Sequence, residues 1–69
     1  MTLGQRVRMR RKELGWTQEE LGKKVSYEQD EISKLERGYI KDIPSQRLRT
    51  LALALDISTD WLLDLEPVA

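Results

Sequence analysis

Signals that begin and end helices recur at short intervals along this chain, and their spacing limits what it can fold into. Thr2 and Gln5 have the Ser/Thr-x-x-Glu/Gln spacing of a capping box, in which two side chains close the first turn of a helix. Thr17 and Glu20 repeat this signature, and Gly15 stands just before it, where a helix would end in left-handed backbone. No segment alternates apolar and polar residues as a half-buried strand does. The sequence therefore predicts an all-α fold of short helices.

Five helices follow from these signals and from apolar residues at helical spacing. They are expected at about residues 3–14, 18–25 and 28–37, then from Ser45 to a close at Asp56, and from a cap at Ser58 or Thr59 onward. The last two helices would turn inward the apolar residues Leu48, Leu51, Ala52, Leu55, Trp61, Leu62 and Leu65. Residues 39–44 would form a loop. We expect one compact five-helix bundle that spans residues 1–69 as a single domain.

The composition removes several classes of function. The 69 residues include no cysteine and no histidine, so the chain has no disulfide, thiolate nucleophile, histidine-based triad or common type of zinc site. No set of base, nucleophile and oxyanion donor can be named, so we expect no enzyme, no metal and no cofactor. The longest apolar run, residues 51–55, is far shorter than the roughly 20 residues that span a bilayer, and no leader opens the chain. A soluble cytoplasmic protein with no membrane partner is expected.

Charge is divided unevenly between the two parts of the chain. Residues 1–24 hold seven bases and three acids, a net charge of +4, and the remaining residues balance this with −4. A neutral total argues against a protein that coats nucleic acid nonspecifically, because such a domain is strongly basic. The basic start of the chain is either a local phosphate-facing surface or simply a solvated first helix.

The first helix carries an arginine toward the core. Leu3, Val7 and Leu14 mark its inner face, and Arg11 lies one turn after Val7. A partly buried guanidinium needs a carboxylate, and Glu36 is the acid best placed on an inward-leaning face of the third helix. The spacing thus predicts an Arg11–Glu36 ion pair. The alternative is that the stem of Arg11 covers apolar surface while its head reaches water.

The segment TQEELGKKVSYEQDEISKLERG, residues 17–38, holds two short helices joined by a tight connection, which is helix-turn-helix spacing. It resembles the lambda repressor/Cro helix-turn-helix family, whose typical run is T-Q-x-E-L-A-x-x-x-G-[V/T]-[S/T]-x-x-x-I-S-x-[I/L]-E-x-G. The matching positions are Thr17, Gln18, Glu20, Leu21, Gly22, Ile32, Ser33, Leu35, Glu36 and Gly38. The likeness extends over about residues 3–65, because ALALDISTDWLLDL resembles the family's A-x-A-L-G-V-S-x-D-W-L-L ending.

The resemblance implies a double-stranded DNA-binding domain of prokaryotic or phage origin, in which the third helix enters the major groove. Base-facing positions of the family are matched by Glu28, Gln29, Asp30 and Lys34. Positions that touch or adjoin the DNA backbone are matched by Thr17, Gln18, Arg37, Tyr39 and Lys41. A structural ion pair close to the phosphates is matched by Arg11 and Glu36. The expected function is transcriptional regulation, with repression favoured, through a roughly palindromic operator.

Two features depart from the family pattern. Ser26 stands where the family usually has a glycine in the turn, so it must adopt left-handed backbone, at a cost of ~1 kcal/mol, or shift the turn. Ser26 could instead form a capping box with Gln29 and start the third helix early. The loop between the third and fourth helices is also a residue or two longer than in many family members.

Three carboxylates, Glu28, Asp30 and Glu31, lie in the stretch that would approach DNA. One interpretation is that they stabilise the positive start of the third helix. A second is direct readout, in which Gln29 bonds adenine while Glu28 or Asp30 accepts from cytosine N4. A third keeps the fold and changes the partner, so that the acidic helix binds a basic protein surface as an antagonist or assembly module.

Apolar residues near the end of the chain exceed what so small a monomer would bury: Leu62, Leu63, Leu65 and Val68. A two-fold homodimer through the C-terminal helix is therefore expected, at least on DNA, with the two third helices about 34 Å apart. Trp16 and Trp61 each lie beside a helix start with apolar neighbours, so we interpret them as fillers of helix junctions rather than stacking platforms.

Overall fold

The computed structural model describes residues 1–40 and 42–63. Within these residues it contains no strand and has the α-helices α1 (Leu3–Glu13), α2 (Gln18–Val25), α3 (Gln29–Glu36), α4 (Ser45–Leu55) and α5 (Thr59–Leu62). The predicted all-α, five-helix fold is confirmed. The bounds of the first four helices agree with the expected ones to within one residue.

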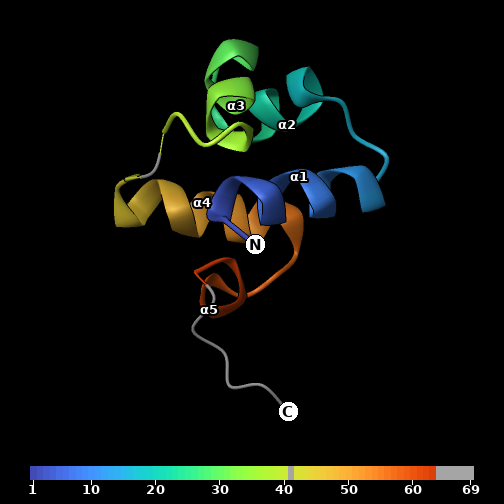
Figure 1. Ribbon diagram of the computed structural model, residues 1–69. Helices are drawn as coiled ribbons and strands as arrows, with labels where there is room; N and C mark the ends of the chain where they lie inside the picture. Colours follow the sequence, from blue (N-terminus) through green and yellow to red (C-terminus); the bar gives the residue numbers. More distant parts are fainter. Residues whose placement is uncertain (41, 64–69) are drawn as a thin grey trace.

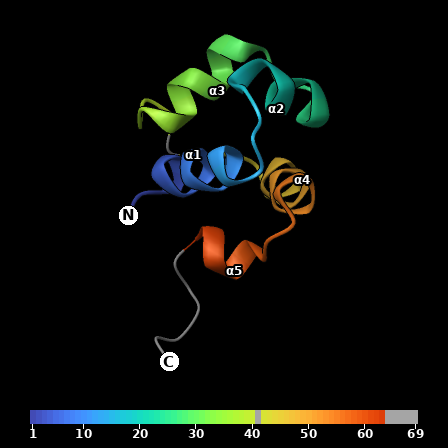
Figure 2. The ribbon, with the colours of Figure 1, turned by 90° about the vertical axis from the view of Figure 1, so that its right-hand side faces the viewer.

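The helices are arranged in three tiers. Figure 1 shows α2 and α3 side by side above α1 and α4, with α5 below them. The quarter-turn view in Figure 2 keeps the same order, so α2–α3 and α5 lie on opposite sides of the α1–α4 tier. This arrangement leaves the outer side of α2 and α3 uncovered by any other described helix.

The core lies where the helices meet, and every helix contributes to it. Its buried apolar side chains are Val7, Leu21, Val25, Ile32, Leu35, Leu48, Leu51, Ala52, Leu55 and Leu62. Burying a side chain of this size stabilises a fold by roughly 1.5–3 kcal/mol, so in a chain without cysteine this cluster holds the helices together. Trp16 and Trp61 are partly buried and pack against the cluster, which confirms their interpretation as junction fillers.

Leu62 is a core residue. It is only 1% exposed, which confirms the inward orientation expected for it in the last helix and removes it from the apolar surplus. Leu63, the next residue, is 43% exposed. Leu65 and Val68, the other residues of that surplus, lie outside the described residues.

Two arginines of α1 bond the backbone of other helices, Arg10 that of α4 and Arg6 that of α5. The Nε atom of Arg10 donates to the carbonyl oxygen of Leu55 at 2.8 Å, at the C-terminal end of α4, where a cation suits the helix dipole. The Nη1 atom of Arg6 donates to the carbonyl oxygen of Trp61 at 3.0 Å, and its guanidinium lies 5.0 Å from the centroid of the same indole ring. The basic start of the chain is therefore partly used in packing and is not simply a solvated face.

The turn between α2 and α3 settles the two possibilities for Ser26. Its φ of 61° and ψ of 37° are left-handed, and it is the C-cap of α2. A capping box between Ser26 and Gln29 is therefore wrong. Helix α3 begins with Glu28 as its N-cap, whose N–H donates to Oε1 of Glu31 at 3.2 Å. The helix thus starts at Gln29, one residue later than the sequence predicts.

Helices α1 and α3 pack very closely at Gly4. A Cβ atom placed on Gly4 would overlap the carbonyl oxygen of Leu35, which is a backbone atom and cannot be displaced cheaply. This contact fixes how deeply α3 sits on α1. Across the described ranges, no helix has the length and apolar character needed to cross a membrane.

Candidate nucleic-acid interface

Helices α2 and α3 form the helix-turn-helix unit. Left-handed Ser26 reverses the chain, and the N–H of Tyr27 then donates to the carbonyl oxygen of Gly22 at 2.8 Å. A Cβ atom on Gly22 would lie 2.5 Å from the carbonyl oxygen of Tyr27, so the turn closes this tightly only over a glycine. On the inner side, Leu21, Val25 and Ile32 are buried in the core. The outer side of α3 is thereby fixed in direction.

The four side chains that match base-facing positions all lie on exposed positions of α3 or its cap: Glu28, Gln29, Asp30 and Lys34. Together they carry one net negative charge, because Lys34 offsets Asp30 and Glu28 remains. The Nζ atom of Lys34 is 3.1 Å from Oδ2 of Asp30, one turn earlier on the same helix. This ion pair is exposed, so its stabilising effect is small, but it offsets the charge of Asp30.

The predicted Arg11–Glu36 ion pair is confirmed. Nε of Arg11 donates to Oε2 of Glu36 at 2.7 Å and Nη2 donates to Oε1 at 2.9 Å, a two-point contact between α1 and α3. Arg11 is 7% exposed and Glu36 6%, so the alternative of an arginine head in water is wrong. The hydrogen bond to Glu36 raises the pKa of Arg11 above its ordinary value. Arg11 also donates from Nη1 to the carbonyl oxygen of Trp16 at 2.8 Å.

A chain of side-chain hydrogen bonds runs from this buried pair to the exposed face of α3. Nε2 of Gln18 donates to Oε1 of Glu36 at 3.2 Å. Oε1 of Gln18 in turn accepts from Nε2 of Gln29 at 3.2 Å. The orientation of Gln29 is thus coupled through Gln18 to the core, and this bond uses only the amide nitrogen of Gln29, so its amide oxygen can accept from another partner.

The start of α2 is closed by a capping box. The Thr17 hydroxyl accepts from the N–H of Glu20 at 3.0 Å, and the N–H of Thr17 donates to Oε1 of Glu20 at 3.0 Å. These hydrogen bonds lower the pKa of the Glu20 carboxyl below its ordinary value. Because Thr17 is used in the cap, an anion at this helix end would be met by the other N–H groups of the first turn.

The residues after α3 form the third part of the site. Arg37 is the C-cap of α3, and its guanidinium carbon lies 5.1 Å from the centroid of the Tyr39 ring. Tyr39 is 72% exposed, so this pair stands at the surface beside the end of α3. Lys41, the remaining residue matched to the DNA backbone, lies outside the described residues.

Arg47 and Tyr27 adjoin the site, and the sequence did not single them out as site residues. The guanidinium carbon of Arg47, on α4, is 4.4 Å from the centroid of the Tyr27 ring in the turn. Nη1 of Arg47 lies 3.9 Å from Oε2 of Glu31 on α3. Burial raises the pKa of Tyr27 above its ordinary value. No local signal pairs these residues, because the loop between α3 and α4 brings them together.

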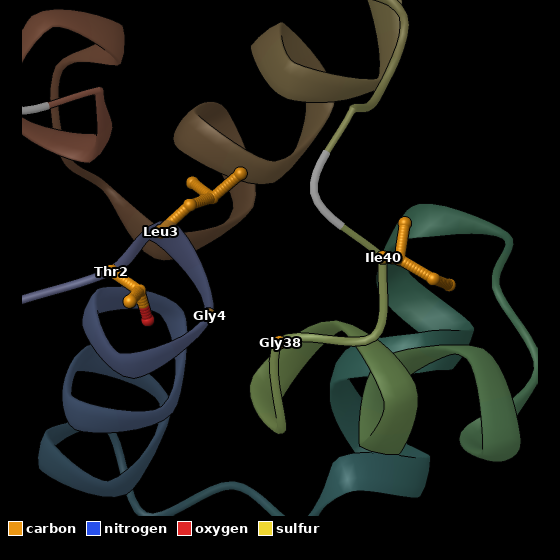
Figure 3. Close-up of a pocket in the computed structure, with 5 residues that line it drawn as sticks. All are labelled: Thr2, Leu3, Gly4, Gly38 and Ile40. Carbon is orange, nitrogen blue, oxygen red and sulfur yellow. The ribbon is translucent and has the colours of Figure 1, made fainter.

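A cavity of about 310 Å³ lies between the start of α1 and the residues that follow α3. Figure 3 shows its lining residues Thr2, Leu3, Gly4, Gly38 and Ile40, with Leu3 and Ile40 on opposite sides. Its lining holds no ionisable side chain, so the cavity supplies neither a base nor a nucleophile.

Comparisons with known proteins agree with this geometry. A family model described as helix-turn-helix matches residues 7–62. The HTH-type transcriptional regulator ImmR of Bacillus subtilis (strain 168) is 33% identical over 69 residues, which are 100% of this chain and 54% of that protein. The chain thus spans about half the length of this curated relative.

Two solved structures have the same fold. The P22 c2 repressor in complex with a synthetic operator has a TM-score of 0.87 and 36% identity, over 96% of this chain and 98% of that chain. SinR, described as the master regulator for biofilm formation, in complex with DNA has a TM-score of 0.83 and 31% identity, over 88% of this chain and 97% of that chain. SinR is also similar to this chain in its complex with the SinI protein. The resemblance to lambda repressor-like domains is therefore confirmed, and the chain belongs to the helix-turn-helix family.

Proposed function

We propose that this chain is the sequence-specific, double-stranded DNA-binding domain of a transcriptional repressor. The observation that carries the proposal is its close match in fold and sequence to the P22 c2 repressor in complex with an operator. The exposed, rigidly backed face of α3 supports it, because a helix of this kind fits the major groove of B-DNA. A bacterial or phage cytoplasm is the location we propose, and we assign the domain no enzymatic activity.

In this proposal α3 contributes the side chains that read bases: Glu28, Gln29, Asp30 and Lys34. Gln29 is the strongest of these, because its bond to Gln18 leaves the amide oxygen to accept from adenine N6. An unpaired carboxylate can accept from cytosine N4, and a base that presents an acceptor there is then rejected. The acids thereby lower affinity for DNA in general and raise selectivity for one sequence.

The residues proposed to touch the DNA backbone are Thr17, Gln18, Arg37, Tyr39 and Lys41, of which Thr17 and Gln18 lie at the start of α2 and Arg37 and Tyr39 at the end of α3. At the start of α2 the first-turn N–H groups and the helix dipole favour a phosphate. Arg37 and the Tyr39 hydroxyl provide donors at the other end of α3. Arg11 and Glu36 hold α1 and α3 in register close to these phosphates.

We further propose that the domain binds as a two-fold homodimer. Leu63, the C-cap of α5, is 43% exposed, and an exposed apolar residue is suited to a contact between copies. Two copies related by a two-fold axis would read a roughly palindromic site with half-sites one helical turn, about 34 Å, apart.

The second candidate function is a protein-interaction module. It is favoured by the acidic start of α3, where Glu28, Asp30 and Glu31 would suit a basic protein surface. The existence of a SinR complex with a protein partner supports it as well. Here α3 would be the docking helix, and DNA would bind weakly and without sequence preference.

Selection from a randomised duplex pool, at low and at physiological salt, separates the two functions. A DNA reader enriches a two-fold symmetric motif with half-sites one turn apart, and the enrichment survives the higher salt because base contacts persist. Folded protein that enriches nothing at either salt would contradict the first function and favour the second. Circular dichroism of the same sample shows that the protein is folded.

A further inference from the structure

The start of α3 is acidic, and DNA, which is a polyanion, repels negative side chains. Three carboxylates lie within four residues there, Glu28, Asp30 and Glu31. Asp30 is offset by Lys34 from its own helix, at 3.1 Å. A second cation near this cluster comes from outside the helix-turn-helix: it is Arg47, on α4.

Arg47 makes two contacts at once. Its guanidinium lies 4.4 Å from the ring centroid of Tyr27, in the turn before α3, and its Nη1 lies 3.9 Å from Oε2 of Glu31, in the first turn of α3. The other oxygen of Glu31 accepts the N–H of Glu28, the N-cap. One side chain from α4 is therefore linked to the turn, the cap and the first turn of the helix.

The placement of Glu31 separates it from its acidic neighbours. Asp30 has a side chain that is 71% exposed, whereas that of Glu31 is 44% exposed and directed to α4. Its two oxygens have partners within the protein, so it is not placed to accept from a base. Its negative charge nevertheless stays close to the surface that meets DNA, and a counter-charge is needed there.

We infer that Arg47 is a positioning residue for DNA recognition, which holds Glu31 against α4 and neutralises its charge so that the start of α3 can approach a duplex. This inference rests on the proposed function. Arg47 acts through Glu31 and Tyr27 and need not touch DNA itself. Loss of Arg47 leaves one uncompensated carboxylate beside the phosphates and frees the start of α3 to move.

A double-mutant cycle between the two charged groups tests the inference. Binding of the wild type, Arg47→Gln, Glu31→Gln and the double variant to the preferred duplex is measured by fluorescence anisotropy over a range of salt. Glu31→Gln keeps an oxygen that can accept the Glu28 N–H. Arg47→Gln should weaken binding about fivefold, the factor that corresponds to a partly exposed ion pair. In the Glu31→Gln background the same change should alter Kd less than about twofold.

The alternatives give different results. If Arg47 contacts a phosphate directly, Arg47→Gln weakens binding equally in both backgrounds and reduces the salt slope by about one, and the inference fails. It fails also if Arg47→Gln leaves Kd unchanged. Arg47→Met removes the charge but keeps an apolar stem over Tyr27, so it should also weaken binding about fivefold. Agreement between the two variants would show that a folding defect of Arg47→Gln is not the cause of the loss.

Controls separate this inference from the proposed function. Arg49→Gln removes the same charge from the same helix, and its effect on Kd should not depend on Glu31. If the wild type selects no duplex, the proposed function fails and the inference fails with it. If the wild type selects its site and the cycle is additive, only the role of Arg47 is wrong.

Discussion

At the scale of single residues, the buried ion pair between Arg11 and Glu36 predicts a large loss of stability when one partner is removed. Glu36→Ala would leave the Arg11 guanidinium buried without its counter-ion, so the free energy of unfolding should fall by about 3–5 kcal/mol. Urea denaturation followed by circular dichroism measures this change. Replacing both partners, with Arg11→Met and Glu36→Leu, should recover most of the loss because no buried charge remains.

An exposed pair on α2 provides the control for this prediction. Lys23 lies 3.6 Å from Glu19, and both side chains are largely exposed. Lys23→Ala should therefore change the free energy of unfolding by less than about 1 kcal/mol. If Glu36→Ala destabilised the protein no more than Lys23→Ala does, the strength assigned to the buried pair would be wrong.

Ser26 is a second residue whose backbone predicts a measurable effect. It adopts a φ of 61°, and a left-handed residue with a Cβ atom is strained by about 1–2 kcal/mol relative to glycine. Ser26→Gly relieves this strain, but glycine also gains entropy in the unfolded chain, which opposes folding. The free energy of unfolding should therefore rise by only about 0.5–1 kcal/mol. Gly15→Ala, at a φ of 75° with open space around it, should have the opposite sign. A loss of stability in Ser26→Gly would refute this account.

Residue-level prediction from the sequence succeeded where helical spacing fixes direction. Arg11 follows Val7 by one turn and Glu36 follows Ile32 by one turn, so both had to lean inward, and the pair was predictable. Arg47 was not singled out, since its contacts with Tyr27 and Glu31 depend on the path of the loop before α4. Periodicity carries no information about that path.

At the scale of helices, the crossing of α1 and α3 depends on Gly4. Alanine is the better helix former by about 1 kcal/mol, so propensity alone predicts that Gly4→Ala stabilises the protein. The overlap with the Leu35 carbonyl predicts the reverse, a loss of about 1–3 kcal/mol as α1 and α3 separate. Urea denaturation gives the sign. Lys12→Ala, at an exposed position of the same helix, should change stability by no more than about 0.5 kcal/mol.

The cap of α2 predicts a dependence on pH. The pKa of Glu20 is lowered in the folded state by its hydrogen bonds to Thr17, so its contribution is present above the unfolded pKa. That contribution is lost as the pH falls below about 4.3 and through the lower folded value. Glu20→Gln keeps an acceptor without a charge, so its thermal midpoint should fall less on acidification than that of the wild type. Parallel acid profiles of the two proteins would refute this role for Glu20.

The helices themselves were largely predictable, because caps and apolar spacing are local signals. Both Thr capping boxes form at the positions where the sequence has them. The start of α3 was the exception, since Glu28 and Glu31 close its first turn in place of the Ser/Thr signature. A left-handed Ser26 was one of two possibilities, and only packing of Tyr27 over Gly22 decides between them.

At the scale of the whole molecule, the tiers separate two proposed tasks. The α2–α3 tier presents the face proposed to meet DNA, while α5, which ends at the exposed Leu63, lies on the other side of the α1–α4 tier (Figure 2). The neutral total charge implies that specificity comes from base contacts more than from bulk attraction.

The central claim, that the start of α3 reads bases, is tested most directly by selecting duplexes with the wild type and with Gln29→Ala from one randomised pool. If α3 reads bases, both proteins enrich a two-fold symmetric motif and the variant loses its preference at one base pair in each half-site. All other positions should keep their preference. An unchanged motif for folded Gln29→Ala would contradict this role of α3, and a wild type without any motif would contradict DNA reading altogether.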